Sequence, residues 1–72
     1  MEEITKTQYD ALMAYVIHPS LPEHVKSDID YVKSVLLTTQ NGKYFLEYIE
    51  FEELCEEEIH EIKAAGTVIT FK

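Results

Sequence analysis

The sequence predicts an α+β fold with the element order α-α-β-β-α-β in a single small acidic domain, residues 1–72. Three observations lead to this fold class. Apolar residues recur at helical spacing near the beginning of the chain. Asn41-Gly42 then separates two runs rich in β-branched and aromatic residues. Helical spacing returns after Phe51 and gives way to a last β-rich segment.

Two helices are expected before the β-rich region. The first covers residues 7–17 and starts at Thr7, which begins a Thr-x-x-Asp capping box. Pro19 ends this helix, because the residue before a proline is pushed out of the helical region. The second covers residues 21–31, with Pro22 in its first turn, where the missing N–H is harmless.

A β-hairpin is expected over residues 34–50. Asn-Gly favours a type I′ turn because both central residues need positive φ. A two-residue turn at this point pairs Gln40 with Lys43, Thr39 with Tyr44, Leu37 with Leu46, Val35 with Tyr48, and Lys33 with Glu50. The competing interpretation continues the second helix through Leu36 and Leu37.

The third helix is expected over residues 52–65, with Cys55 on its buried apolar stripe and Gly66 as a left-handed stop. A strand over residues 67–71 follows. A right-handed crossover would place this strand beside the first strand of the hairpin. The result would be a three-stranded antiparallel sheet in the order 3-1-2, with the helices packed on one face.

Composition excludes several classes of function. The chain has 14 acidic and 6 basic residues and a net charge of −8, and every basic residue is a lysine. Without arginine it lacks the fork that reads guanine edges, so direct binding to nucleic acid is not expected. No apolar run approaches the ~20 residues of a membrane helix, and Met1-Glu2-Glu3 lacks the basic start of a secretory signal. We therefore expect a cytoplasmic protein that does not bind membranes.

No catalytic, cofactor or metal site is expected. The chain contains no GxSxG turn and no glycine-rich phosphate loop. Glu57 and His60 form only one half of a di-iron motif, and Cys55 has no partner for a disulfide or a CxxC zinc pair. These observations favour a protein that is not an enzyme.

The most conspicuous feature is an acidic stretch from Glu47 to Glu61, which holds eight of the 14 acidic residues and no lysine. Its helical part predicts an exposed stripe that could bind a basic protein and imitate nucleic acid. This candidate partner-binding stripe comprises Glu52, Glu53, Glu56, Glu57 and Glu61, with Glu47 and Glu50 as an extension. The alternative is a solvated helix surface that serves solubility alone.

The second hairpin strand carries apolar residues on both faces, with Phe45 and Ile49 on one of them. A second copy covering that face would explain the pattern, so we expect a homo-oligomer, most simply a homodimer, that self-associates through Phe45 and Ile49. For function we expect a small accessory or regulatory protein, such as an inhibitor of a basic, nucleic-acid-binding partner. The alternatives are a structural or assembly subunit of a larger complex, of phage or mobile-element type, and a small enzyme.

Overall fold

The computed structural model describes residues 1–18, 20–27 and 34–71. The strands are β1 (Glu2–Ile4), β2 (Ser34–Gln40), β3 (Lys43–Ile49) and β4 (Thr67–Thr70), and the helices are α1 (Lys6–Ala14), α2 (Glu23–Lys26), α3 (Glu56–Ala65) and the 3₁₀ turn η1 (Phe51–Glu53). The α+β class is confirmed. Among the described residues, no helix is long and apolar enough to cross a membrane. Pro19, the expected helix beyond residue 27 and the expected Lys33–Glu50 pair lie outside the described residues.

The strands form one antiparallel sheet in the order β1-β3-β2-β4. The three expected strands are neighbours in this sheet, but the expectation of three strands was wrong, because β1 adds a fourth beside β3. With only three residues, β1 is too short to display a β period. It is held in place by pairing with β3 and by the buried side chain of Ile4, which lies opposite Tyr44.

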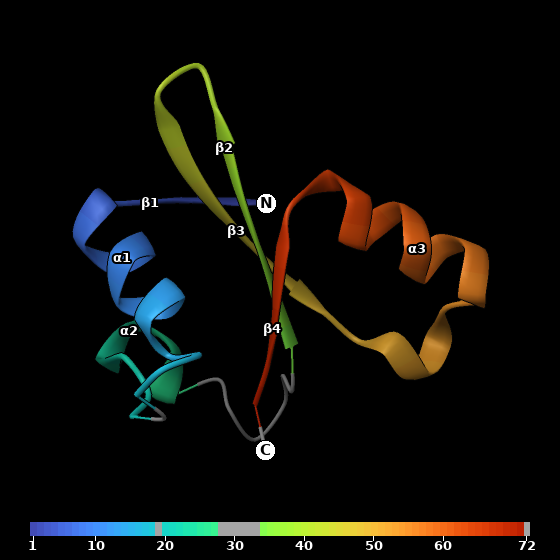
Figure 1. Ribbon diagram of the computed structural model, residues 1–72, viewed down its shortest axis with the longest axis horizontal. Helices are drawn as coiled ribbons and strands as arrows, with labels where there is room; N and C mark the ends of the chain where they lie inside the picture. Colours follow the sequence, from blue (N-terminus) through green and yellow to red (C-terminus); the bar gives the residue numbers. More distant parts are fainter. Residues whose placement is uncertain (19, 28–33, 72) are drawn as a thin grey trace.

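The β2–β3 hairpin has the expected register. Asn41 and Gly42 have φ values of 53° and 75°, as a type I′ turn requires. The observed pairs are Gln40 with Lys43, Thr39 with Tyr44, Leu37 with Leu46, and Val35 with Tyr48. The described residues therefore exclude a second helix that continues through Leu36 and Leu37. In Figure 1 the hairpin tip projects beyond the rest of the molecule.

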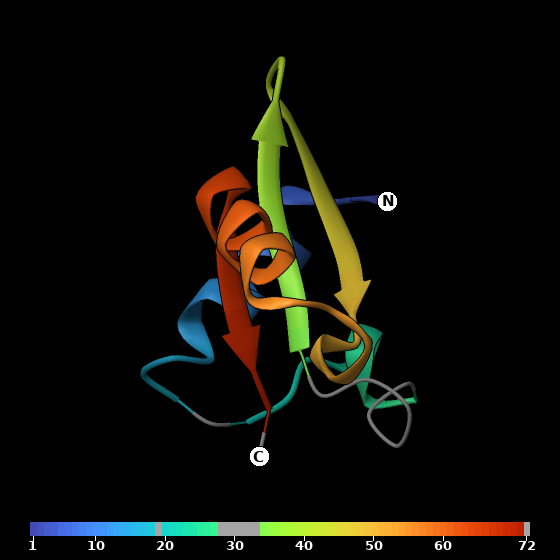
Figure 2. The same cartoon turned by 90° about the vertical axis from the view of Figure 1, so that its right-hand side faces the viewer.

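Helices lie on both faces of the sheet, so the expectation that they would all cover one face was wrong. Figure 1 places α1 and α2 on one side of the sheet and α3 on the other, and Figure 2, viewed from the α3 side, shows the same arrangement. Alternate residues of β2 point to opposite faces. Val35 and Leu37 belong to the main core, whereas Ser34 and Leu36, only 3% and 4% exposed, lie on the opposite face. Burial of both faces explains why the hairpin strands do not alternate cleanly between apolar and polar residues.

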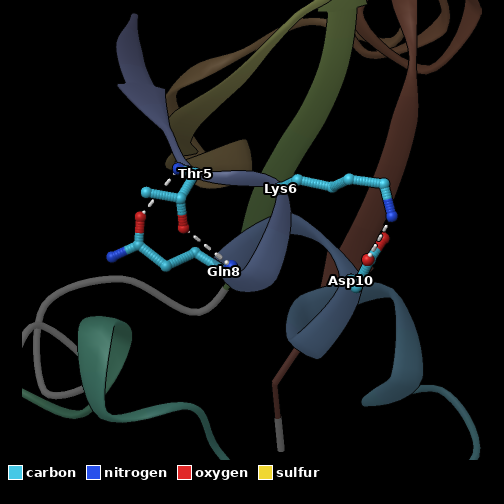
Figure 3. A network of polar contacts seen from close by, with 4 residues as sticks. All are labelled: Thr5, Lys6, Gln8 and Asp10. Carbon is cyan, nitrogen blue, oxygen red and sulfur yellow. Dashed lines mark hydrogen bonds and ion pairs between the residues drawn. The ribbon is translucent and has the colours of Figure 1, made fainter.

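The first helix covers Lys6–Ala14 instead of the expected residues 7–17, and its capping box uses Thr5 instead of Thr7 (Figure 3). The Thr5 hydroxyl accepts a hydrogen bond from the Gln8 backbone N–H, and the Gln8 side chain accepts one from the Thr5 N–H. Lys6, the first residue of α1, donates a hydrogen bond to Asp10, one turn further along the helix, at 2.9 Å. This bond and the charge of Asp10 raise the pKa of Lys6 above its ordinary value of 10.5. With its start fixed in this way, α1 places Leu12, which is fully buried, in the main core.

Gly66 connects α3 to β4 and brings the helix close to β2. Its φ is −178°, which is extended, so the expected left-handed stop was wrong. A Cβ at Gly66 would lie 2.7 Å from Thr38 Cγ2 and would clash with the carbonyl oxygen of Leu37. Glycine is therefore needed here because the two backbones approach closely, and this approach sets the position of α3 over the sheet.

Candidate partner-binding surface

The five carboxylates of the predicted stripe are all exposed, but they do not share one helix. Glu52 and Glu53 belong to η1, and Glu56, Glu57 and Glu61 belong to α3. Between these elements, Leu54 and Cys55 have extended backbones, with ψ values of 146° and 165°. The expected continuous helix over residues 52–65 was therefore wrong, and the stripe is divided into two groups.

Cys55 is the N-cap residue of α3, which begins at Glu56. Glu56, Glu57 and Glu58 occupy the first turn of α3, where carboxylates favour the positive end of the helix dipole. Cys55 is exposed, and its thiol donates a hydrogen bond to Glu58 Oε1 at 3.2 Å, so the expected burial of this cysteine was wrong. Three consecutive glutamates after a non-helical residue are a signal of a helix start, which the apolar periodicity through Leu54 obscured.

The two acidic groups are nevertheless on the same side of the molecule. Lys63 of α3 places its ammonium nitrogen 5.9 Å from the centre of the Phe51 ring in η1, which is within the range of a cation–π contact. Figure 2 shows η1 and α3 together on the face of the sheet that looks toward the viewer. The chain thus folds back, so that η1 and α3 lie beside each other.

A pocket of about 370 Å³ opens in this region, between the end of β3, η1 and α3. Its apolar lining comes from Tyr48, Ile49, Leu54 and Ile62. Its carboxylates are Glu47, Glu50 and Glu53. Small-ligand pockets in proteins span about 300 to 1,000 Å³, so this one is near the lower limit. Its size is suited to one or two side chains of a partner.

The pocket carboxylates have no neutralising partner in the described part of the chain. Glu47, Glu50 and Glu53 are exposed, and none of them forms a salt bridge with a described lysine or histidine. The described salt bridges join Lys6 to Asp10, His24 to Glu2, and Lys26 to Glu23, all on β1, α1 or α2. The field of the pocket carboxylates is therefore directed into solvent and attracts cations.

The two residues expected to mediate self-association differ in their surroundings. Ile49 is only 6% exposed and lines the pocket, so this chain itself buries it and a second copy is not needed for that purpose. Phe45 remains half-buried on the same face of β3. Sequence reasoning missed that η1 and α3 cover part of this face. The apolar pocket residues come from three separate elements, and no local sequence pattern connects them.

His60 is exposed on α3, and no group of three or more potential metal ligands occurs among the described residues.

Comparisons with known proteins add no further assignment. No protein-family model, curated protein or solved structure matches this chain. The exposed carboxylates of this surface and its pocket are the basis for a functional proposal.

Proposed function

We propose that this chain is a non-enzymatic accessory or regulatory protein that binds a basic protein through its acidic surface. The single observation that carries the proposal is that Glu47, Glu50 and Glu53 are exposed in the lining of an apolar pocket and have no salt-bridge partner among the described residues. The acidic first turn of α3 follows η1 in the chain and adds further exposed carboxylates. A surface of this kind accelerates encounter with a cationic protein and repels nucleic acid.

The mode of action would be competition. A protein that binds nucleic acid presents lysine and arginine side chains to the phosphates. Carboxylates arranged over a turn of 3₁₀ helix and the first turns of an α-helix offer those side chains alternative anionic partners. Occupation of the basic surface would then inhibit nucleic-acid binding, as expected of a nucleic-acid mimic.

A peptide-binding experiment tests this proposal. A fluorescent peptide rich in lysine and arginine serves as the probe, and fluorescence anisotropy reports its binding to the whole chain. The triple variant Glu53→Gln, Glu56→Gln, Glu57→Gln removes three carboxylates and changes helix propensity little. We expect its affinity to fall about three- to 150-fold and its salt dependence to flatten, because three exposed ion pairs worth roughly 0.2 to 1 kcal/mol each are lost.

The matched control removes the same number of charges elsewhere. This control variant combines three substitutions at residues of β1, α1 and α2: Glu2→Gln, Asp10→Asn and Glu23→Gln. This control variant should bind the peptide within about twofold of the wild type, a change of about 0.4 kcal/mol. Equal losses in the two triple variants would show that only net charge matters, and an unaltered affinity in the first variant would refute the proposal.

One observation favours the alternative, a structural or assembly subunit. No residue of α3 is buried, although the helix carries Ile59 and Ile62 at apolar positions, and both are half-buried. A helix covered only partly by its own chain can bury more apolar area in a complex. If Ile59→Ser abolished binding to the native partner and the glutamine triple variant did not, the assembly role would replace the regulatory one.

A further inference from the structure

We infer that the pocket between β3, η1 and α3 receives one long basic side chain, lysine or arginine, from the protein partner. The inference rests on the proposed function and specifies how the acidic surface recognises its partner. It assigns the apolar residues of the pocket a role that an acidic surface alone does not require.

The lining of the pocket has two parts with different chemistry. The apolar part consists of Ile49, which is buried, and of Leu54 and Ile62, which come from the η1–α3 connection and from α3 and are half-buried. Glu47 and Glu50, at the end of β3, are exposed to solvent. An occupant that fits this arrangement has an apolar section and a cationic end.

Long basic side chains have this composition. The methylene stem of lysine or arginine buries against apolar surface while the charged end remains near water and anions. A purely apolar side chain would remove water from the neighbourhood of the three carboxylates and supply no counter-charge, which is unfavourable. An anionic ligand would be repelled by the same carboxylates. Charge complementarity therefore selects a basic side chain as the occupant.

The experiment uses the isotopically labelled whole chain and the blocked amino acid N-acetyl-lysine N′-methylamide, followed by NMR chemical shifts. N-acetyl-norleucine N′-methylamide is the matched control ligand, because it has an apolar side chain of similar length and no charge. We expect the lysine compound to bind in the millimolar range, with the largest shifts at Ile49, Leu54 and Ile62. The norleucine compound should bind at least about threefold more weakly, since it lacks the ionic contact.

Variants then connect binding to the pocket. Glu47→Gln with Glu50→Gln should weaken lysine binding about three- to tenfold. Glu3→Gln with Glu23→Gln removes the same charge from β1 and α2, outside the pocket lining, and should weaken it less than about twofold. Equal losses in both variants, equal binding of norleucine, or shifts centred elsewhere would each overturn the inference.

Two further measurements distinguish this inference from a polyamine site and from failure of the proposed function. Spermidine that binds the same residues at least about tenfold more tightly than the lysine-rich peptide would indicate a free polyamine as the occupant, and would also overturn the inference. The glutamine triple variant of η1 and α3 retains Glu47 and Glu50. If that variant loses peptide affinity while the Glu47 and Glu50 variant binds lysine normally, the pocket inference fails and the proposed function stands.

Discussion

Replacement of Gly66 by alanine should destabilise the protein by forcing α3 away from β2. The new Cβ would lie 2.7 Å from Thr38 Cγ2 and 3.2 Å from Leu36 Cδ1, and it would clash with the Leu37 carbonyl oxygen. The φ of −178° suits any residue, so the cost is steric. Leu37 cannot move easily, because β2 is paired with β3 on one side and β4 on the other.

The expected magnitude follows from this rigidity. Overpacking a tight site costs about 1 to 3 kcal/mol, and a clash with a fixed backbone atom belongs in the upper part of that range, about 2 to 3 kcal/mol. A chain of this length has a total stability of about 4 to 11 kcal/mol. The variant should therefore fold, with a Tm lower by about 10 to 20 °C.

Urea denaturation followed by far-ultraviolet circular dichroism measures this change, and an unchanged m value would confirm that the unfolded state is comparable. Thr38→Ser in the Gly66→Ala background removes one of the methyl contacts but leaves the Leu37 carbonyl in place. It should restore less than half of the lost free energy of unfolding. An alanine variant within about 0.5 kcal/mol of the wild type, or full rescue by Thr38→Ser, would refute the reasoning.

Two other predictions follow from the fold, and a third, self-association, follows from the apolar pattern of the second hairpin strand. Gly42→Val should cost about 1 to 2 kcal/mol of unfolding free energy, because φ is 75° there, and a cost near zero would contradict the type I′ turn. Thr5→Ala should cost about 1 kcal/mol and Thr5→Ser much less, since serine retains the hydroxyl that accepts the Gln8 N–H bond; equal losses in urea denaturation would contradict the cap. Sedimentation equilibrium at tens of micromolar should give a dimer that Phe45→Ser dissociates; a wild-type mass of 8.4 kDa would exclude self-association at that concentration.

The parts of the fold that depend on local chemistry could be predicted from the sequence. The Asn41-Gly42 turn sets the register of the hairpin by itself, because its two positive φ values and the two-residue loop fix which residues face each other. The position of β4 beside β2 was predicted by assuming a right-handed crossover, and the structure pairs these two strands. In both cases a nearby residue or a general chain rule determines the result.

The parts that depend on contacts between distant segments could not be predicted. β1 exists because Ile4 finds a place in the core and Glu2 to Ile4 pair with β3, neither of which a three-residue segment signals. Gly66 looked like a helix stop, but its role is set by the Leu37 carbonyl, 29 positions earlier in the chain. The acidic residues of the candidate surface were visible in the sequence. The pocket was not, because it forms only when α3 packs near the end of β3.

The two faces of the sheet differ in how completely the chain covers them, and this difference connects the fold to the proposed function. The α1 and α2 face holds the main core, including the fully buried Leu12 and Leu46. On the opposite face, α3 is held by the close approach at Gly66 and the contact of Lys63 with Phe51, and none of its own residues is buried. α1 therefore contributes a buried side chain to the core, Leu12, whereas α3 contributes none. Apolar surface that the fold leaves half-covered is available to a partner, and the carboxylates beside it select a partner that is basic.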